Sequence, residues 1–87
     1  MSALRQVLTP QNFALVLPGM PMEQVRKMLG KPMKVTPMAL KRETHYEWRY
    51  SDGPNTPRIF RVEFDSDMKV VRTGSVPDES QLGGNAT

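Results

Sequence analysis

The spacing of the hydrophobic residues changes near residue 44. Before that point, apolar residues recur every three to four positions in two short segments, residues 9–17 and 21–29, as on one face of a helix. The residues that form these two apolar faces are Phe13, Val16, Leu17, Val25, Met28 and Leu29. After residue 44, apolar and polar residues alternate with a period of two, which is typical of half-buried strands. The pattern therefore predicts two short helices followed by a sheet.

Local signals mark the ends of both helices. Thr9-Pro10 offers an N-cap followed by proline at the first helical position, and Pro18-Gly19 ends that helix. Pro21 suits the first turn of the second helix, Gly30 suits its C-terminal cap, and Pro32 prevents its continuation. Isolated helices shorter than about 12–15 residues are marginal in water, so we expect packing to hold these two in place.

Three segments show the alternation of strands: THYEWRY at 44–50, RIFRVEF at 58–64 and MKVVRTGSV at 68–76. Short loops without a helix join them, which indicates an antiparallel meander. Residues 33–41 look extended, but Pro37 interrupts regular pairing, so we do not count this segment as a strand.

The predicted fold class is α+β, with two short N-terminal helices packed on a three-stranded antiparallel sheet as an ααβββ two-layer sandwich. The sheet face toward the helices is expected to carry Tyr46, Trp48, Tyr50, Phe60, Val62, Phe64 and either Val70 or Val71. We assign the aromatic residues to the core rather than to base stacking. Residues 1–8 are expected to be a flexible N-terminal arm, 9–76 a single domain and 77–87 a disordered C-terminal tail.

Composition narrows the class of protein. The chain has 87 residues, which suits one domain with a modest core, and it has no cysteine, which excludes disulfides and thiolate metal sites. No stretch approaches the roughly 18 apolar residues that span a bilayer, and the N-terminus lacks the apolar core of a secretory signal. Two expectations follow: a cytoplasmic protein, or one whose targeting segment has been removed.

The positive charge is concentrated in one segment. The net charge is +3, and residues 24–42 contain no acidic residue. The cations of this segment are Arg26, Lys27, Lys31, Lys34, Lys41 and Arg42. Such a segment can face the phosphates of nucleic acid or of anionic lipid, or simply form a solvated basic face.

The sequence contains no recognisable catalytic set. His45 is the single histidine and has no second histidine or cysteine as a companion, so we interpret it as a surface histidine on a strand. Asp65 and Asp67 begin like a calcium loop, but Val70 and Val76 stand where that loop needs glycine and glutamate, so we expect a hairpin turn. We expect no enzymatic activity, no cofactor, no metal and no small-molecule substrate.

Several motifs occur in an order that is specific when they are taken together. They are Gly19-Met20, Glu23-Gln24-Val25, Leu29-Gly30 with Pro32, the strand HYEWRY and the run FRVEFDSDMKVV. This series resembles the SmpA/OmlA family, the BamE-like small outer-membrane lipoproteins, over residues 8–78. Pro21 departs from the Ser or Thr that the family usually has there, and the sequence shows neither a signal peptide nor a lipobox cysteine.

The resemblance implies a non-enzymatic role on a fold of two helices and a three-stranded sheet. Members of the family support the machinery that inserts β-barrel proteins into the outer membrane. The implied partners are other subunits of this machinery, including a partner lipoprotein, and anionic phospholipid, but no nucleic acid. The implied location is the periplasmic face of the outer membrane, with a lipid anchor that this sequence does not contain.

The resemblance also implies a contact surface after the second helix and on the outer face of the first predicted strand. Carried over residue by residue, this surface falls on Gly30, Pro32 and Met33 and on residues 45–49, of which we expect His45 and Arg49 to be exposed. To these we add Lys31, Lys34 and Met38, because of the charge of the lysines and the adaptable side chain of methionine. We expect the three cations to contact phosphate groups and the two methionines to provide apolar docking. We expect the imidazole to be exposed and to make a contact at the rim.

Two other functions stay open on the sequence alone. A cytoplasmic nucleic-acid-binding module would use the basic segment 24–42 and would bind oligonucleotides less tightly as salt increases. A protein-inhibitor or structural interaction module would use the outer face of the sheet, because the predicted fold also resembles that of β-lactamase inhibitory proteins.

Overall fold

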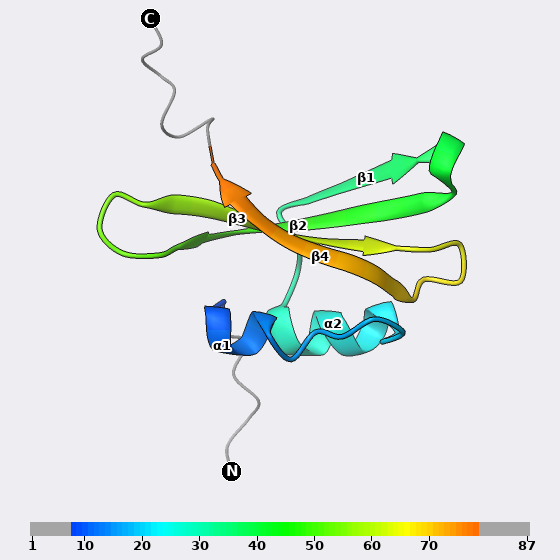
Figure 1. The fold of residues 1–87 in the computed structure, drawn as a ribbon, viewed down its shortest axis with the longest axis horizontal. Helices are drawn as coiled ribbons and strands as arrows, with labels where there is room; N and C mark the ends of the chain where they lie inside the picture. Colours follow the sequence, from blue (N-terminus) through cyan, green and yellow to red (C-terminus); the bar gives the residue numbers. More distant parts are fainter. Residues whose placement is uncertain (1–7, 79–87) are drawn as a thin grey trace, which may run out of the picture.

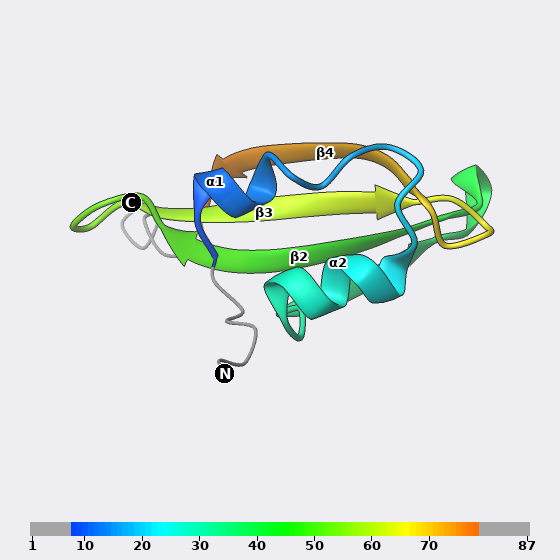
Figure 2. The same cartoon turned by 90° about the horizontal axis from the view of Figure 1, so that it is seen from below.

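The computed structural model describes residues 8–78, which form a helical layer on a sheet (Figure 1). The elements in chain order are α1 (Pro10–Phe13), α2 (Met22–Leu29), β1 (Lys34–Met38), the 3-10 turn η1 (Ala39–Lys41), β2 (Glu43–Ser51), β3 (Pro57–Phe64) and β4 (Val70–Pro77). Both helices lie on the same face of the sheet, with α2 running along β2 (Figure 2). The prediction of two helices on an antiparallel sheet is confirmed. Most of the predicted N-terminal arm and C-terminal tail lies outside the described residues.

The sheet has four strands, so the prediction of three strands was wrong. Its order is β1-β2-β3-β4, and all neighbouring strands are antiparallel. β1 pairs with β2 from Lys34, opposite Glu47, to Met38, opposite Glu43. Pro37 lies within this ladder and is tolerated because β1 is an edge strand, where one side of the backbone has no partner strand.

Both helices are short, and α1 is shorter than predicted. The Asn12 backbone N–H donates to Oγ1 of Thr9 at 3.3 Å, which is the predicted N-cap. Because α1 ends at Phe13, Leu17 is not on its buried face and is 57% exposed, so its predicted place in the core was wrong. α2 ends as predicted at Gly30, whose φ of 86° glycine adopts easily. Neither of these helices is long and apolar enough to cross a membrane.

The core lies between the helices and the sheet. Its buried residues are Phe13, Val16, Val25, Leu29, Tyr46, Trp48, Tyr50, Phe60, Val62, Phe64 and Val70. Phe13 stacks on Phe60 with 4.0 Å between the ring centroids, which holds α1 against β3. The Trp48 indole N–H donates to the Gly30 carbonyl at 3.0 Å, which holds the end of α2 against β2. Met28, predicted to be a core residue, packs against this cluster and is half-buried.

The linker between the two helices pairs with the start of β4. The Gly19 N–H donates to the Val70 carbonyl at 2.8 Å, and the Val70 N–H donates to the Met20 carbonyl at 2.8 Å. A register shift opposite Phe64 turns Val70 into the core and leaves Val71 half-buried. This irregularity decides which of the two predicted valines is the core residue.

The described chain ends in contact with the sheet. β4 runs through Pro77, where we predicted the start of the tail, and the N–H of Asp78 donates to the Pro57 carbonyl at 3.0 Å. The Asp78 side chain is 1% exposed. These two residues therefore belong to the folded sheet.

Candidate functional site

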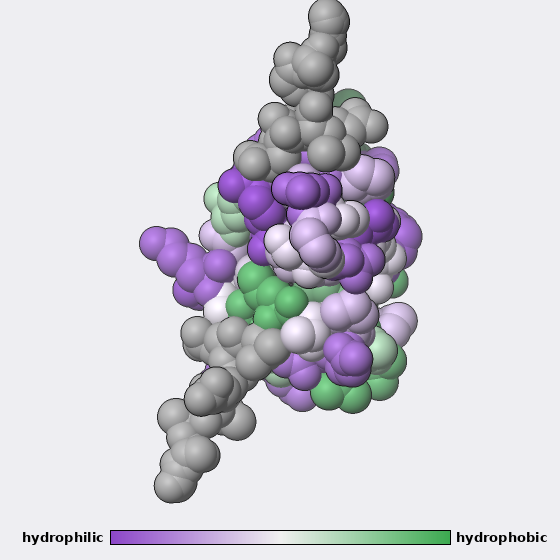
Figure 3. All heavy atoms as spheres, turned by 90° about the vertical axis from the view of Figure 1, so that its left-hand side faces the viewer, coloured by the Kyte–Doolittle hydropathy of each residue, from purple (hydrophilic) through white to green (hydrophobic). Residues whose placement is uncertain are grey.

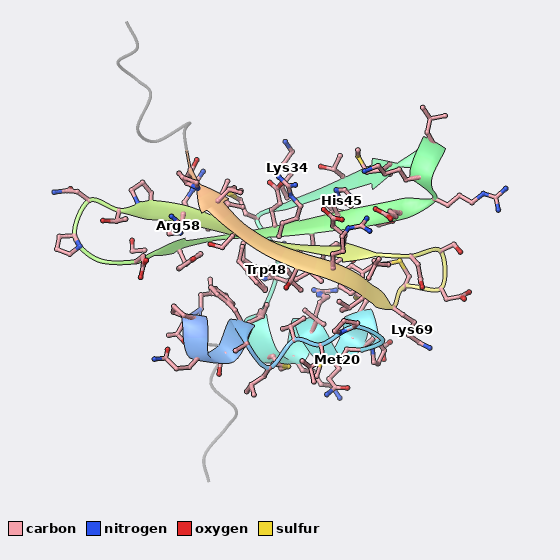
Figure 4. The ribbon with its side chains drawn as sticks, in the orientation of Figure 1. Met20, Lys34, His45, Trp48, Arg58 and Lys69 are labelled. Atoms are coloured by element: carbon pink, nitrogen blue, oxygen red, sulfur yellow. The ribbon has the colours of Figure 1, made fainter. Side chains whose placement is uncertain are left out.

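Three of the predicted contact residues lie on the sheet face opposite the helices. Figure 4 shows Lys34 and His45 on this outer face and Trp48 on the helix side. Alternation along β2 places Arg49 on the same face as His45. Lys34 lies opposite Glu47, two residues before Arg49, so the sheet brings these two cations to neighbouring positions.

The other three predicted residues flank β1 or end it. Lys31 and Met33 lie between α2 and β1, and the Met33 N–H donates to the Glu47 carbonyl at 2.7 Å. Lys31 is exposed and Met33 is 42% exposed, whereas Met38, at the far end of β1, is half-buried. The six residues are therefore divided between the helix exit, the outer sheet face and the end of β1.

Arg49 is paired with the carboxylate that ends the described chain. Its Nε lies 2.7 Å from Oδ2 of Asp78, whose side chain is 1% exposed, while the Arg49 side chain is 47% exposed. A phosphate group at Arg49 would compete with Asp78 for the guanidinium.

His45 is buried, so the prediction of an exposed imidazole was wrong. It is 7% exposed, and its Nε2 lies 3.0 Å from Oε1 of Glu43 and 3.9 Å from Oε1 of Glu63. Glu43 is on the same face of β2, and Glu63 lies directly opposite His45 on β3. The charged side chains of the outer face cover this imidazole.

Arg72 joins the two carboxylates around His45. Its terminal nitrogen donates to both carboxylate oxygens of Glu43, at 2.9 and 2.7 Å, and its Nε donates to Glu63. The pKa of Glu43 is held below its usual value, first by the hydrogen bond from His45 and then by that from Arg72. The pKa of Arg72 is raised by its hydrogen bonds to Glu43 and Glu63. A second arginine, Arg61, pairs with Glu47 at 3.3 Å and lies 3.8 Å from Glu63.

The predicted basic segment differs from this outer-face network. None of its six cations forms an ion pair within residues 8–78. Three of them, Arg26, Lys27 and Lys31, border a shallow open depression along α2. The residues that line this depression are Met22, Glu23, Arg26, Lys27, Gly30 and Lys31. These three cations beside α2 are thus available to an anionic partner.

Exposed apolar residues lie beside some of these cations. Leu40 in η1 is 101% exposed and precedes Lys41 and Arg42, and Val35 in β1 is 49% exposed beside Lys34. We did not predict either residue as a contact, because neither lies in a periodic pattern from which its exposure could be predicted. Figure 3 shows, at the end of the sheet that carries the β2–β3 loop, small hydrophobic groups separated by hydrophilic residues.

One cluster has the chemistry to hold a metal ion. The ligand atoms of Glu43, His45 and Glu63 all lie within 4.8 Å of one another. The sequence offers His45 no second histidine or cysteine as a companion, and carboxylates distant in the sequence give no such signal. Glu63 is 18 residues from His45 in the sequence, and only the pairing of β2 with β3 brings them together.

Comparisons with known proteins point to one family. Residues 6–74 match the family model of the outer membrane protein assembly factor BamE domain. A solved structure described as the osmotically inducible lipoprotein OsmE matches with a TM-score of 0.62 and 24% sequence identity, and the match covers 79% of each chain. At this identity the structural likeness supports the fold alone. A search of curated proteins found no match.

Proposed function

The chain belongs to the BamE family of outer-membrane protein assembly factors, and from this we propose that it is a non-enzymatic accessory subunit of the machinery that inserts β-barrel proteins. The observation that carries the proposal is a family match that spans residues 6–74 and so nearly all of the described fold. Family membership associates the chain with outer-membrane assembly on the periplasmic side. Attachment through an N-terminal lipid is part of the proposal.

The architecture suits a binding subunit better than an enzyme. The helix-facing side of the sheet is filled by the core, and the outer face carries ion pairs. The depression along α2 is shallow and open, whereas small-molecule sites are usually enclosed clefts. We infer that the protein acts through its exposed surfaces, as a scaffold that holds partners together.

The proposed protein-docking surface is the connection from α2 into β1. Met33 and Val35 are 42% and 49% exposed, and Lys31 and Lys34 are also exposed. The hydrogen bond from the Met33 N–H to Glu47 fixes the backbone of this connection against β2. Alternation along β1 puts Val35 on the helix side of the sheet and Lys34 on the outer face, so a partner that packs along this edge would meet apolar side chains and cations together. A rigid edge of this kind suits another subunit of the machinery with complementary apolar and acidic groups.

Co-purification tests the docking surface. A Met33→Glu variant should recover the subunits of the barrel-assembly machinery, identified by mass spectrometry from solubilised outer membranes, at least tenfold less well than the unmodified chain. Leu17→Glu is the matched control, because Leu17 is similarly exposed but belongs to another part of the surface. Equal recovery with both variants would overturn this docking surface, and recovery of no subunit by the unmodified chain would overturn the proposed function.

Anionic phospholipid is a second proposed partner. Leu40, Lys41 and Arg42 form an exposed tip in which a fully exposed leucine adjoins two cations that form no ion pair within residues 8–78. An apolar side chain that enters the interface beside cations that contact lipid phosphates is a common means of membrane contact. This tip supports lipid binding better than Arg49 does, because Arg49 is already paired with Asp78.

Nucleic-acid binding is less well supported by the arrangement of the cations. Arg26, Lys27 and Lys31 border the depression along α2, whereas Lys34 lies on the outer face of the sheet. A nucleic-acid strand would need a continuous basic path along one surface. For the inhibitor-like alternative, the outer sheet face would have to bind through side chains that are already paired with one another.

A further inference from the structure

We propose that Glu43, His45 and Glu63 form a binding site for a zinc-type divalent metal ion, and that Arg72 occupies this site when the metal is not bound. The proposal concerns the outer face of the sheet and does not depend on the proposed function. It departs from our sequence-based expectation of no metal site, which rested on the lack of a second histidine or a cysteine. The three residues are called the Glu–His–Glu cluster below.

The distances between the ligand atoms suit a small metal ion. Nε2 of His45 lies 3.0 Å from Oε1 of Glu43 and 3.9 Å from Oε1 of Glu63. In a tetrahedral zinc site with bonds of about 2.0–2.2 Å, neighbouring ligand atoms lie roughly 3.3 Å apart. Small side-chain rotations are therefore enough to bring all three atoms to bonding distance.

The backbone already holds these ligands in place. Glu43 and His45 are two residues apart on β2 and share one face, and Glu63 is the direct cross-strand neighbour of His45. The three side chains are 13%, 9% and 16% exposed, so little water must be displaced to bring a cation between them. Ligands on paired strands of one sheet lose little conformational freedom when a metal binds.

The charges of the cluster also favour a divalent cation. The two carboxylates carry two negative charges. The guanidinium of Arg72, which lies 2.7 Å from Glu43, neutralises part of this charge. The Arg72 side chain is 51% exposed, so it can turn into solvent and leave its position to a metal. Arg61, on the same face of β3, remains 3.8 Å from Glu63 and lowers the affinity somewhat. The cross-strand neighbour of His45 on β1 is Thr36, which adds no charge to the cluster.

An imidazole with two carboxylates selects among metals. A nitrogen ligand suits zinc and neighbouring transition metals, whereas calcium and magnesium prefer sites built only from oxygen. A metal can bind Nε2 of His45 only when that nitrogen carries no proton. In the neutral imidazole the proton must then be on Nδ1, and a charged imidazole must release one proton when the metal binds.

A purely structural ion-pair cluster is the competing explanation, and Arg72 distinguishes the two. If Arg72 competes with the metal, Arg72→Gln should bind zinc more tightly than the unmodified chain. If the cluster serves only to join the strands, Arg72→Gln should lose stability and gain no affinity for zinc.

The test is a titration of the tag-free full chain with zinc chloride. Calorimetry measures the affinity, and proton NMR observes the imidazole of the single histidine. Zinc should shift the imidazole signals of the unmodified chain. Arg72→Gln should bind at least tenfold more tightly, and addition of His45→Gln to that variant should remove the gain. Asp52→Asn, which removes an exposed carboxylate in the β2–β3 loop, is the control and should change nothing.

A folded Arg72→Gln variant that binds zinc no more tightly than the unmodified chain would overturn the competition by Arg72, and either of two further results would overturn the metal site itself. The first is imidazole signals that millimolar zinc leaves unmoved in the unmodified chain. The second is tenfold tighter binding in Arg72→Gln that persists after His45→Gln is added. If Arg72→Gln does not fold, the NMR titration of the unmodified chain decides, with Arg72→Lys as the second variant.

Discussion

Asp78 lies buried against Arg49, with its Oδ2 2.7 Å from the guanidinium Nε, although 29 residues separate the two in the sequence. The contact joins the residue after β4 to the outer face of β2, and β3 lies between these two strands in the sheet. Arg49, which we predicted as a phosphate contact, is therefore also part of the structure that holds the last described residues in place.

Removal of Arg49 should destabilise the fold. Arg49→Met leaves the buried Asp78 carboxylate without this cation, and we expect a loss of about 1–3 kcal/mol, less than for a fully buried pair because Arg49 is half exposed to solvent. Urea unfolding measures this. Lys34→Met is the control and should change stability by less than about 0.5 kcal/mol, since Lys34 is exposed and forms no ion pair with the other described residues. Equal stability of the two variants would contradict a role for the Arg49–Asp78 pair.

Replacement of Leu40 should weaken binding to anionic membranes. Burial of one leucine side chain contributes about 1.5–3 kcal/mol, so Leu40→Ser should reduce partition into phosphatidylglycerol vesicles by about tenfold or more. Leu15→Ser is the matched control, because Leu15 is also well exposed but its neighbours in the sequence, Ala14 and Val16, carry no charge. Vesicle co-sedimentation provides the measurement. Equal losses in both variants would indicate unspecific apolar contact instead of a lipid-binding tip.

The indole N–H of Trp48 should contribute measurably to stability. Trp48→Phe leaves the Gly30 carbonyl without its buried donor and creates a small cavity, and together these should cost about 2–4 kcal/mol. Thermal or urea unfolding gives the value. A loss below about 1 kcal/mol would mean that water or a side-chain shift replaces this hydrogen bond.

The stabilising contribution of Glu43 should be lost in acid. Its folded-state pKa lies below the usual 4.5, so its stabilising contribution is complete above pH 4.5 and is lost as the pH falls through the lowered value. Glu43→Gln, which cannot titrate, should therefore show a flatter fall in the urea midpoint below pH 4.5 than the unmodified chain. Glu23→Gln serves as the control, because Glu23 is exposed and forms no ion pair within residues 8–78. Parallel curves for the unmodified chain and Glu43→Gln would contradict the lowered pKa.

Local patterns in the sequence were sufficient to predict most of the core and both helix positions. The Thr9 cap, the end of α2 at Gly30 and the inward-facing aromatic residues of β2 all depend on neighbours within a few positions. The propensities and periodicities that produce these features act at short range, so they can be read from the chain directly. The family resemblance rests on the same local motifs and was confirmed by the match over residues 6–74.

The tertiary structure decided what depends on the register between strands. β1 is a strand because β2 offers it a partner, despite Pro37, and Val70 is a core residue because a register shift turns it inward. His45 is buried because β3 and β4 bring Glu63 and Arg72 beside it. Cross-strand neighbours are determined by strand pairing and not by distance in the sequence. Alternation with a period of two therefore predicts which face of the sheet a residue occupies, but not which residues lie beside it.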